Sequence, residues 1–243
     1  MKKLLFILLA LPMLAMASGP SLKLDHAPIN LNDQESLQRG ARVFVNYCLN
    51  CHAASYMRYN RMQDLGLTEL QIKENLLYAA EKPGETMRIA MRLEDAKAWF
   101  GAPPPDLSVI TRSRGSDWVY TYLRSFYRDD SRPTGWNNSV FDKVGMPHVM
   151  QEMQGHLAPV YRSVKGEDGK EHHVIERFEL VKPGKLTLAE YDAMVGDLTN
   201  YLSWMGEPAK GDRMRIGLVV LLFLSVFYVI AFYLKKEFWK DVH

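Results

Sequence analysis

Cysteine is scarce in this chain: only Cys48 and Cys51 occur among 243 residues. A fold held by disulfides needs several pairs, and a structural zinc site needs about four ligands. No second cysteine pair is present to complete either arrangement. Both classes are therefore disfavoured, and the two cysteines must be explained as one local feature.

The chain also lacks a strong net charge, internal repeats and low-complexity tracts. Its formal charge is +2. Residues 18–209 contain 22 Lys and Arg and 25 Asp and Glu, so the formal charge of this part is slightly negative, at about −3. Nucleic-acid binding domains are usually basic, so we expect no nucleic-acid partner. An acidic surface instead suits a basic soluble partner.

Long apolar runs are confined to the two ends. The first run, Leu4–Met16, follows Lys2 and Lys3 and ends at an Ala15-Met16-Ala17 sequence typical of a cleavage site. It is too short for a good spanning helix. We therefore expect residues 1–17 to be a signal peptide that is removed after export; an uncleaved N-terminal anchor is the alternative.

The second run, Ile216–Leu234, has nineteen residues without a charge. As a helix it would be about 28 Å long, close to the thickness of the hydrocarbon core of a bilayer. We expect residues 210–243 to form a C-terminal membrane anchor, with its helix at about 216–234, and a short cytoplasmic tail. Residues 18–209 would then be one exported domain, large enough for its own core.

The two cysteines belong to the motif Cys48-Leu49-Asn50-Cys51-His52. The pattern C-x-x-C-H is the attachment site of c-type haem, in which two thiols bond to the porphyrin and the histidine reaches the iron. A dithiol redox motif is the alternative, but it rarely carries the trailing histidine. The motif predicts one covalently attached haem c, and an exported domain fits because c-type haem is attached outside the cytoplasmic membrane.

The second axial ligand would decide the chemistry of the iron. Methionine raises the potential, a second histidine lowers it, and an open position permits reactions of small molecules. Met146 stands in the irregular sequence Gly145-Met146-Pro147, where a loop could direct it at the iron. Met150 and His148 lie close by and remain alternatives from position alone.

Helical patterns dominate the exported domain. Apolar spacing predicts a helix from Gln34 to Tyr47, with Asn32 or Asp33 as its N-cap, and a helix from Leu188 to Trp204. The second helix should begin at a capping box formed by Thr187 and Glu190. Gly40 in the middle of the first helix suggests a close crossing with another helix. Shorter helices are expected at 69–81, 86–100 and 117–126.

One β-rich region interrupts this pattern. The runs 161–164 and 173–181 flank a Gly166-Glu167-Asp168-Gly169 turn, which is typical of a hairpin. We therefore predict a mainly α fold with a small β-hairpin extension and one C-terminal transmembrane helix.

Further motifs surround the haem motif and reach the C-terminus. They are Arg39-Gly40, Val43-Phe44, Arg58-Tyr59, Pro104-Pro105-Asp106-Leu107-Ser108 with Arg112 and Arg114, Met146-Pro147, and Leu202-x-Trp204-x-x-Glu207-Pro208. Together with the single C-terminal anchor, they resemble the cytochrome c1 family of bacterial type, the haem subunits of the cytochrome bc1 complex. The resemblance implies a class I-like c-type cytochrome domain.

The resemblance also implies a site. Its residues would be Cys48, Cys51, His52, Met146, Pro105 and Arg114. His52 would be the proximal iron ligand and Met146 the distal one, while the segment around Pro105 would line the haem pocket. Arg114 would lie near a propionate, which a guanidinium binds well by paired hydrogen bonds.

The implied function is electron transfer within a quinol–cytochrome c oxidoreductase. Electrons would arrive from the Rieske iron–sulfur protein and leave to a soluble or tethered cytochrome c. Quinol chemistry would belong to cytochrome b, so this chain would carry no quinol site. The complex would be dimeric and lie in the bacterial cytoplasmic membrane, with the haem domain in the periplasm. Alternatives are a membrane-tethered cytochrome c that serves a terminal oxidase, a haem peroxidase and a haem sensor.

Overall fold

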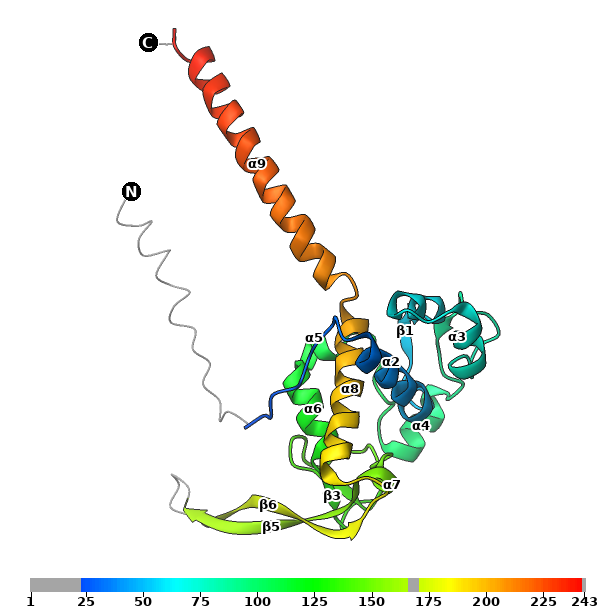
Figure 1. Ribbon diagram of the computed structural model, residues 1–243. Coiled ribbons are helices and arrows are strands. Elements are labelled where there is room, and N and C mark those ends of the chain that lie inside the picture. The colour runs from blue at the N-terminus through cyan, green and yellow to red at the C-terminus, as the bar shows by residue number, and fades with distance from the viewer. Residues whose placement is uncertain (1–22, 166–170, 242–243) are drawn as a thin grey trace.

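A computed structural model describes residues 23–165 and 171–241. The expected signal peptide at 1–17 and the expected turn at 166–169 lie outside these residues. The described chain forms a mainly helical domain with three two-stranded sheets and one long C-terminal helix (Figure 1). The predicted fold class is thereby confirmed.

Two helices, α2 (Gln34–Val43) and α8 (Leu188–Gly206), lie side by side at the centre of the domain. Both begin where the sequence predicts. The Asp33 side chain accepts a hydrogen bond from the Ser36 amide at 3.0 Å, and Thr187 forms the expected capping box with Glu190. The first helix does not continue in α geometry to Tyr47; it becomes a π-helical turn, η2 (Phe44–Cys48).

The two helices approach most closely at Gly40. A Cβ atom at this position would overlap the Asp197 carbonyl oxygen and lie 2.6 Å from Tyr201 Cβ. Beside this contact, Arg39 pairs with Asp197 through two hydrogen bonds of 2.6 and 3.0 Å. The close crossing predicted from a mid-helix glycine is therefore confirmed, and it fixes the position of the haem motif at the end of η2.

Short elements complete the domain. They are β1 (Ala54–Arg58), η3 (Tyr59–Leu65), α3 (Glu69–Asn75), β2 (Thr86–Met87), α4 (Leu93–Phe100), α5 (Ile110–Arg114), α6 (Ser116–Arg124), β3 (Phe126–Arg128), β4 (Trp136–Asn138) and α7 (Gln151–Gln154). Strands β1 and β2 pair antiparallel, as do β3 and β4.

Two of the shorter predicted helices are corrected. The helix expected at 86–100 begins only at Leu93, because Met87 pairs with Ala54 in the β1–β2 ladder and this tertiary pairing overrides the local pattern. The helix expected at 69–81 ends at Asn75. The amides of Leu76 and Leu77 both donate to the Ile72 carbonyl, which closes the last turn.

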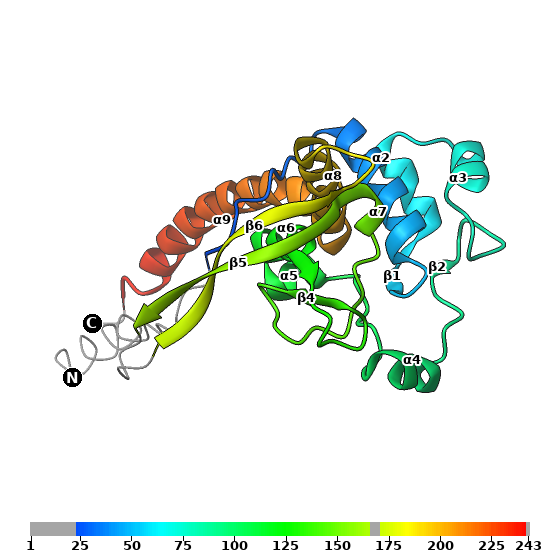
Figure 2. The same cartoon turned by 90° about the horizontal axis from the view of Figure 1, so that it is seen from below.

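The hairpin consists of β5 (Gly155–Lys165) and β6 (Glu171–Pro183), which pair antiparallel from Gly155 opposite Pro183 to Lys165 opposite Glu171. Both strands are longer than predicted. The hairpin is rooted beside β3, where Phe178 packs against Tyr127 at a ring distance of 5.8 Å. From there it projects outward at the end of the domain opposite the C-terminal helix (Figures 1 and 2).

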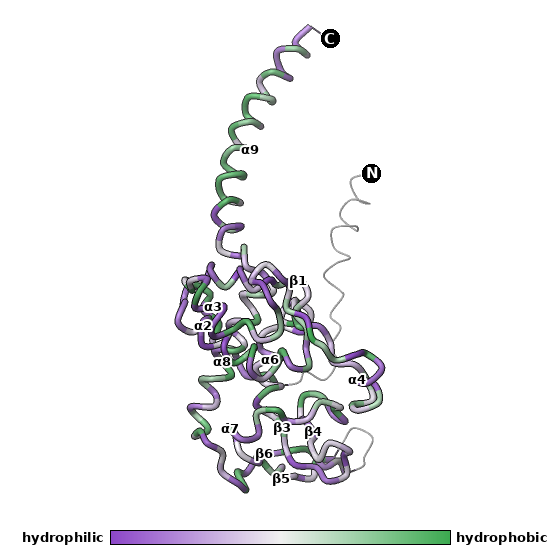
Figure 3. The backbone as a smooth tube through the Cα atoms, turned by 90° about the vertical axis from the view of Figure 1, so that its right-hand side faces the viewer, coloured by the Kyte–Doolittle hydropathy of each residue, from purple (hydrophilic) through white to green (hydrophobic). Residues whose placement is uncertain are grey.

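The C-terminal helix α9 (Lys210–Phe238) has 29 residues and contains the predicted 216–234 segment. Its most apolar window has a mean hydropathy of 2.6, and none of that window is buried against the rest of the protein. The apolar stretch occupies the middle of a helix that leads away from the domain (Figure 3). At about 43 Å, α9 is long enough to cross a bilayer. It is the one candidate membrane span among the described residues.

The junction between the domain and α9 is held by Glu207. Its carboxylate, 20% exposed, pairs with Arg112 of α5 at 3.5 Å and with Arg213 in the first turn of α9. One acidic side chain thus connects the domain to the first turn of the candidate membrane helix.

We expect Gly40→Ala to lower the free energy of unfolding by about 1–3 kcal/mol, the usual cost of overpacking a core. The new methyl group would press on the Asp197 carbonyl. Thermal unfolding of the full-length protein in detergent, followed by circular dichroism, measures the effect. Gly84→Ala is the matched control because no atom lies within 4 Å of its added Cβ. Equal losses in the two variants would contradict the close crossing.

Candidate haem site

A cavity of about 480 Å³ opens between the haem motif and the loop that carries Met146. This volume lies in the usual range for cofactor pockets, roughly 300–1,000 Å³. Leu198 and Leu202 of α8 form part of its lining, and α6 supplies Trp118 and Tyr122. Most of the lining side chains are apolar, so the cavity suits a large, mainly hydrophobic group.

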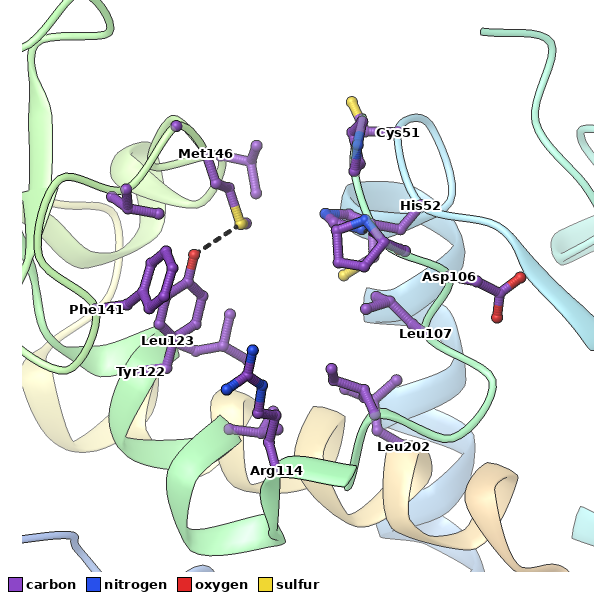
Figure 4. Close-up of a pocket in the computed structure, with 18 of the residues that line it drawn as sticks. Cys51, His52, Asp106, Leu107, Arg114, Tyr122, Leu123, Phe141, Met146 and Leu202 are labelled. Carbon is purple, nitrogen blue, oxygen red and sulfur yellow. Dashed lines mark hydrogen bonds between the residues drawn. The ribbon is translucent and has the colours of Figure 1, made fainter. Parts of the chain in front are cut away.

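All six residues predicted for the site line this cavity: Cys48, Cys51, His52, Pro105, Arg114 and Met146. Figure 4 shows Cys51 and His52 on one wall and Met146 on the opposite wall, with the Met146 sulfur directed into the space between them. The structure thus brings together residues separated by almost a hundred positions in the chain.

His52 is held by one hydrogen bond. Its Nδ1 lies 2.8 Å from the carbonyl oxygen of Pro105 and donates to it, which leaves the Nε2 lone pair free. The side chain is buried, and burial lowers the pKa of His52, although the Pro105 bond opposes that shift. A neutral imidazole with a free Nε2 is the form that binds a metal.

The backbone of the motif is curled around Cys48. Its carbonyl accepts from the Cys51 amide at 3.1 Å and from the His52 amide at 2.8 Å, which keeps the three side chains on one wall of the cavity. Burial raises the pKa of Cys48 to about 12 and also raises the pKa of Cys51. Reactive dithiol motifs have lowered thiol pKa values, so the thiol environment disfavours a dithiol redox motif.

The zinc interpretation finds no support in the described part of the chain. No group of three or more His, Cys, Asp or Glu side chains there could hold a metal ion. This agrees with the absence of a second cysteine pair from the sequence.

The Met146 loop is shaped by close backbone contacts. Gly145 lies against the end of α4, where an added Cβ would be 2.6 Å from the Phe100 carbonyl oxygen. Lys143 adopts a left-handed conformation with φ of 58°. The hydroxyl of Tyr122 donates to Met146 Sδ at 3.3 Å, and burial raises the pKa of this phenol. These contacts direct the thioether into the cavity.

The two alternative ligands lie elsewhere. His148 and Met150 are each 1% exposed and do not line the cavity. The His148 ring stacks on Phe126 with 4.9 Å between ring centroids and 3° between planes. Burial lowers the pKa of His148 to about 4, so it is a neutral core residue at physiological pH. Of the three candidates, only Met146 faces His52.

Arg114 lies on the floor of the cavity in Figure 4, and its guanidinium covers the Trp118 ring at 5.3 Å. Trp118 in turn stacks on Tyr122, with centroids 4.9 Å apart and planes 10° apart. The side chain of Arg114 has no ion-pair partner within residues 23–165 and 171–241. A carboxylate on a bound group could take that role.

Sequence reasoning missed the residue that supports the Met146 loop, Asn138. Its Nδ2 donates to the Tyr122 carbonyl at 2.7 Å, and its Oδ1 accepts from the Val140 and Phe141 amides at 2.9 and 3.2 Å. Asn138 is 1% exposed. Asparagine at the end of a strand is a turn signal, but nothing local shows which carbonyl it will bind.

The residues present fit a c-type haem. Two thiols and a neutral imidazole with a free Nε2 lie on one wall, a thioether lies opposite, and a guanidinium is available for a propionate. Most of the side chains that line the space between them are apolar.

Comparison with known proteins agrees with this geometry. The profile of the Cytochrome C1 family matches residues 25–242. The chain is 50% identical to cytochrome c1 of Allochromatium vinosum, over 98% of this chain and 97% of that protein. It is 47% identical to a Nitrosomonas europaea protein named ammonia monooxygenase gamma subunit, over the full length of both. It is 24% identical to cytochrome b/c1 of Bradyrhizobium diazoefficiens, of which it spans 34%.

We expect Asn138→Ala to loosen residues 139–146, because two loop amides lose their acceptor and the Tyr122 carbonyl loses its bond to this side chain. The free energy of unfolding should fall by about 1–3 kcal/mol, the cost of leaving buried polar groups unpaired. Limited proteolysis should cut this loop faster than in the parent protein. Asn75→Ala, which removes one exposed hydrogen bond to Gln71, is the control. Unchanged cleavage of the 139–146 loop would contradict this role.

Proposed function

This chain belongs to the cytochrome c1 family, and we propose that it is the haem-bearing electron-transfer subunit of a cytochrome bc1 complex. The observation that carries the proposal is the opposition of His52 and Met146 across one apolar cavity. Two filled axial positions suit electron transfer and exclude chemistry on a small molecule at the iron.

Each residue of the site has a distinct role. Cys48 and Cys51 attach one haem c through their thiols. His52 supplies Nε2 as the proximal ligand, while the Pro105 carbonyl holds its tautomer and orientation. Met146 supplies Sδ as the distal ligand. Arg114 binds a propionate carboxylate.

When bound, the haem supplies a ferric–ferrous couple that carries one electron. The Met146 thioether and the apolar walls disfavour the extra positive charge of the ferric state, so they raise the potential. We infer that the electron arrives from the Rieske iron–sulfur protein and leaves to a soluble or tethered cytochrome c. The slightly acidic exported region suits a basic acceptor.

The family and α9 support a proposal for the partners and the location. Cytochrome b, the neighbouring subunit, performs the quinol chemistry, and this chain carries no quinol site. The signal peptide at 1–17 exports residues 18–209 to the periplasm. Residues 210–243 anchor the chain once in the bacterial cytoplasmic membrane, and the complex is a dimer. The name of the Bradyrhizobium relative supports the partnership, because it joins cytochromes b and c1.

A second candidate function comes from the Nitrosomonas relative, whose name assigns it to ammonia monooxygenase. The site argues against oxygenation here, because a haem held by both His52 and Met146 would have no open position for oxygen. A tethered cytochrome for a terminal oxidase is compatible with the same site, so the partners must distinguish it.

We expect the complex to purify with this subunit. A tag at the C-terminus, extraction in mild detergent and a reduced-minus-oxidised spectrum should show b-type haems beside the c-type haem. Electron paramagnetic resonance should show a Rieske iron–sulfur signal. A c-type haem that purifies with oxidase haems or with monooxygenase subunits would contradict the proposal. Extraction into lipid nanodiscs in parallel detects partners that detergent strips.

Replacing the distal ligand should change the haem in a specific way. We expect Met146→Leu to abolish the near-infrared absorption of sulfur bound to ferric iron and to lower the midpoint potential by on the order of 0.1 V or more. Met150→Leu is the matched control, since Met150 is buried outside the cavity and the exchange conserves volume. If Met150→Leu abolished the absorption and Met146→Leu did not, the assignment of the distal ligand would be wrong.

A further inference from the structure

The phenol of Tyr122 lies beside the thioether of Met146. Tyr122 belongs to α6, and its ring is part of the cavity wall. Its hydroxyl donates to Met146 Sδ at 3.3 Å, the bond drawn as a dashed line in Figure 4. Within the described chain this sulfur is the only hydrogen-bond acceptor of that hydroxyl. Because partly buried hydroxyls are normally hydrogen-bonded, the contact is part of the structure and not an incidental approach.

The Tyr122 ring has little freedom to move away from the sulfur. On one side Trp118, one helical turn earlier, stacks on it with planes 10° apart. On the other side Phe126 meets it edge-on, with 5.1 Å between centroids and 71° between planes. The backbone of Tyr122 is tied by its carbonyl to Asn138, at 2.7 Å. The hydroxyl is therefore fixed relative to both α6 and the loop that carries Met146.

A thioether sulfur has two lone pairs, and here they have different partners. One accepts the hydrogen bond from the Tyr122 hydroxyl, so the other would remain for the iron. A hydrogen bond to sulfur withdraws electron density from it and weakens its donation to the metal. Ferric iron depends on that donation more than ferrous iron does. The hydrogen bond would also restrict rotation of the thioether about an iron–sulfur bond.

We propose that Tyr122 is a positioning residue that orients the Met146 sulfur and raises the potential of the haem through this hydrogen bond. The inference rests on the proposed function, in which Met146 is the distal ligand. Tyr122 would act on the Met146 sulfur without contacting the iron. Trp118 and Phe126, which pack on the Tyr122 ring, hold its phenol in place.

The test compares Tyr122→Phe with the parent in the purified complex, by redox titration and near-infrared spectroscopy of the c-type haem. We expect the ferric-to-ferrous ratio at a fixed potential to rise roughly three- to tenfold, the range for loss of one net hydrogen bond. For a one-electron couple this is a midpoint lower by about 28–59 mV. The near-infrared absorption should persist, shifted in wavelength, because sulfur remains bound.

Tyr120→Phe is the matched control. Tyr120 lies two residues earlier on α6, outside the cavity, with its ring under the Arg124 guanidinium at 4.5 Å. The substitution removes the same atom from the same helix, so the midpoint should not change. A midpoint unchanged in Tyr122→Phe, or lowered equally in both variants, would overturn the proposal.

A second variant keeps the test decisive if Tyr122→Phe fails to assemble. Tyr122→3-fluorotyrosine conserves the ring and makes the hydroxyl a stronger donor, so it should raise the midpoint. No rise would overturn the proposal. Failure of the underlying assignment is seen separately, because Met146→Leu would then leave the near-infrared absorption of the c-type haem unchanged.

Discussion

The site depends on one hydrogen bond, from His52 Nδ1 to the carbonyl oxygen of Pro105 at 2.8 Å. It selects the tautomer that leaves Nε2 free, and it orients the ring toward the opposite wall. The Pro105 carbonyl is held in position to accept this bond because two hydrogen bonds join the segment after it to residues just beyond the haem motif. The Leu107 amide donates to the Ala53 carbonyl at 2.8 Å, and the Asp106 carboxylate accepts from the Ser55 amide at 2.9 Å.

The two walls of the cavity are supported by one helix, α8. The haem motif follows α2, which crosses α8 at Gly40 with no room for a side chain. The opposite wall begins at α6, which also packs on α8, where the Tyr191 hydroxyl donates to the Leu123 carbonyl at 2.9 Å. Because both contacts are close and buried, the separation between His52 and Met146 is set by packing. A fixed separation is what an iron with two permanent ligands requires.

The sequence predicted the features that leave a signal in adjacent residues. The haem motif, the Thr187–Glu190 capping box and the close crossing at Gly40 could all be predicted, since each leaves a signal in a few adjacent residues. The start of the helix predicted at 86–100 was wrong because Met87 pairs with Ala54, a contact that no local pattern contains. The choice among Met146, His148 and Met150 likewise needed the fold to show which side chain faces the cavity. The roles of Asn138 and Tyr122 depend on bonds between segments, so the sequence held no signal for them.

The most direct test of the account is exposure of the purified, dithionite-reduced complex to carbon monoxide, with the spectrum of the c-type haem recorded before and after. His52 and Met146 hold both axial positions in this account, so the spectrum should not change. A carbon monoxide spectrum at that haem in the parent protein would show an open or readily displaced position. The chain would then be suited to small-molecule chemistry or sensing, and the claim that it serves electron transfer alone would be wrong.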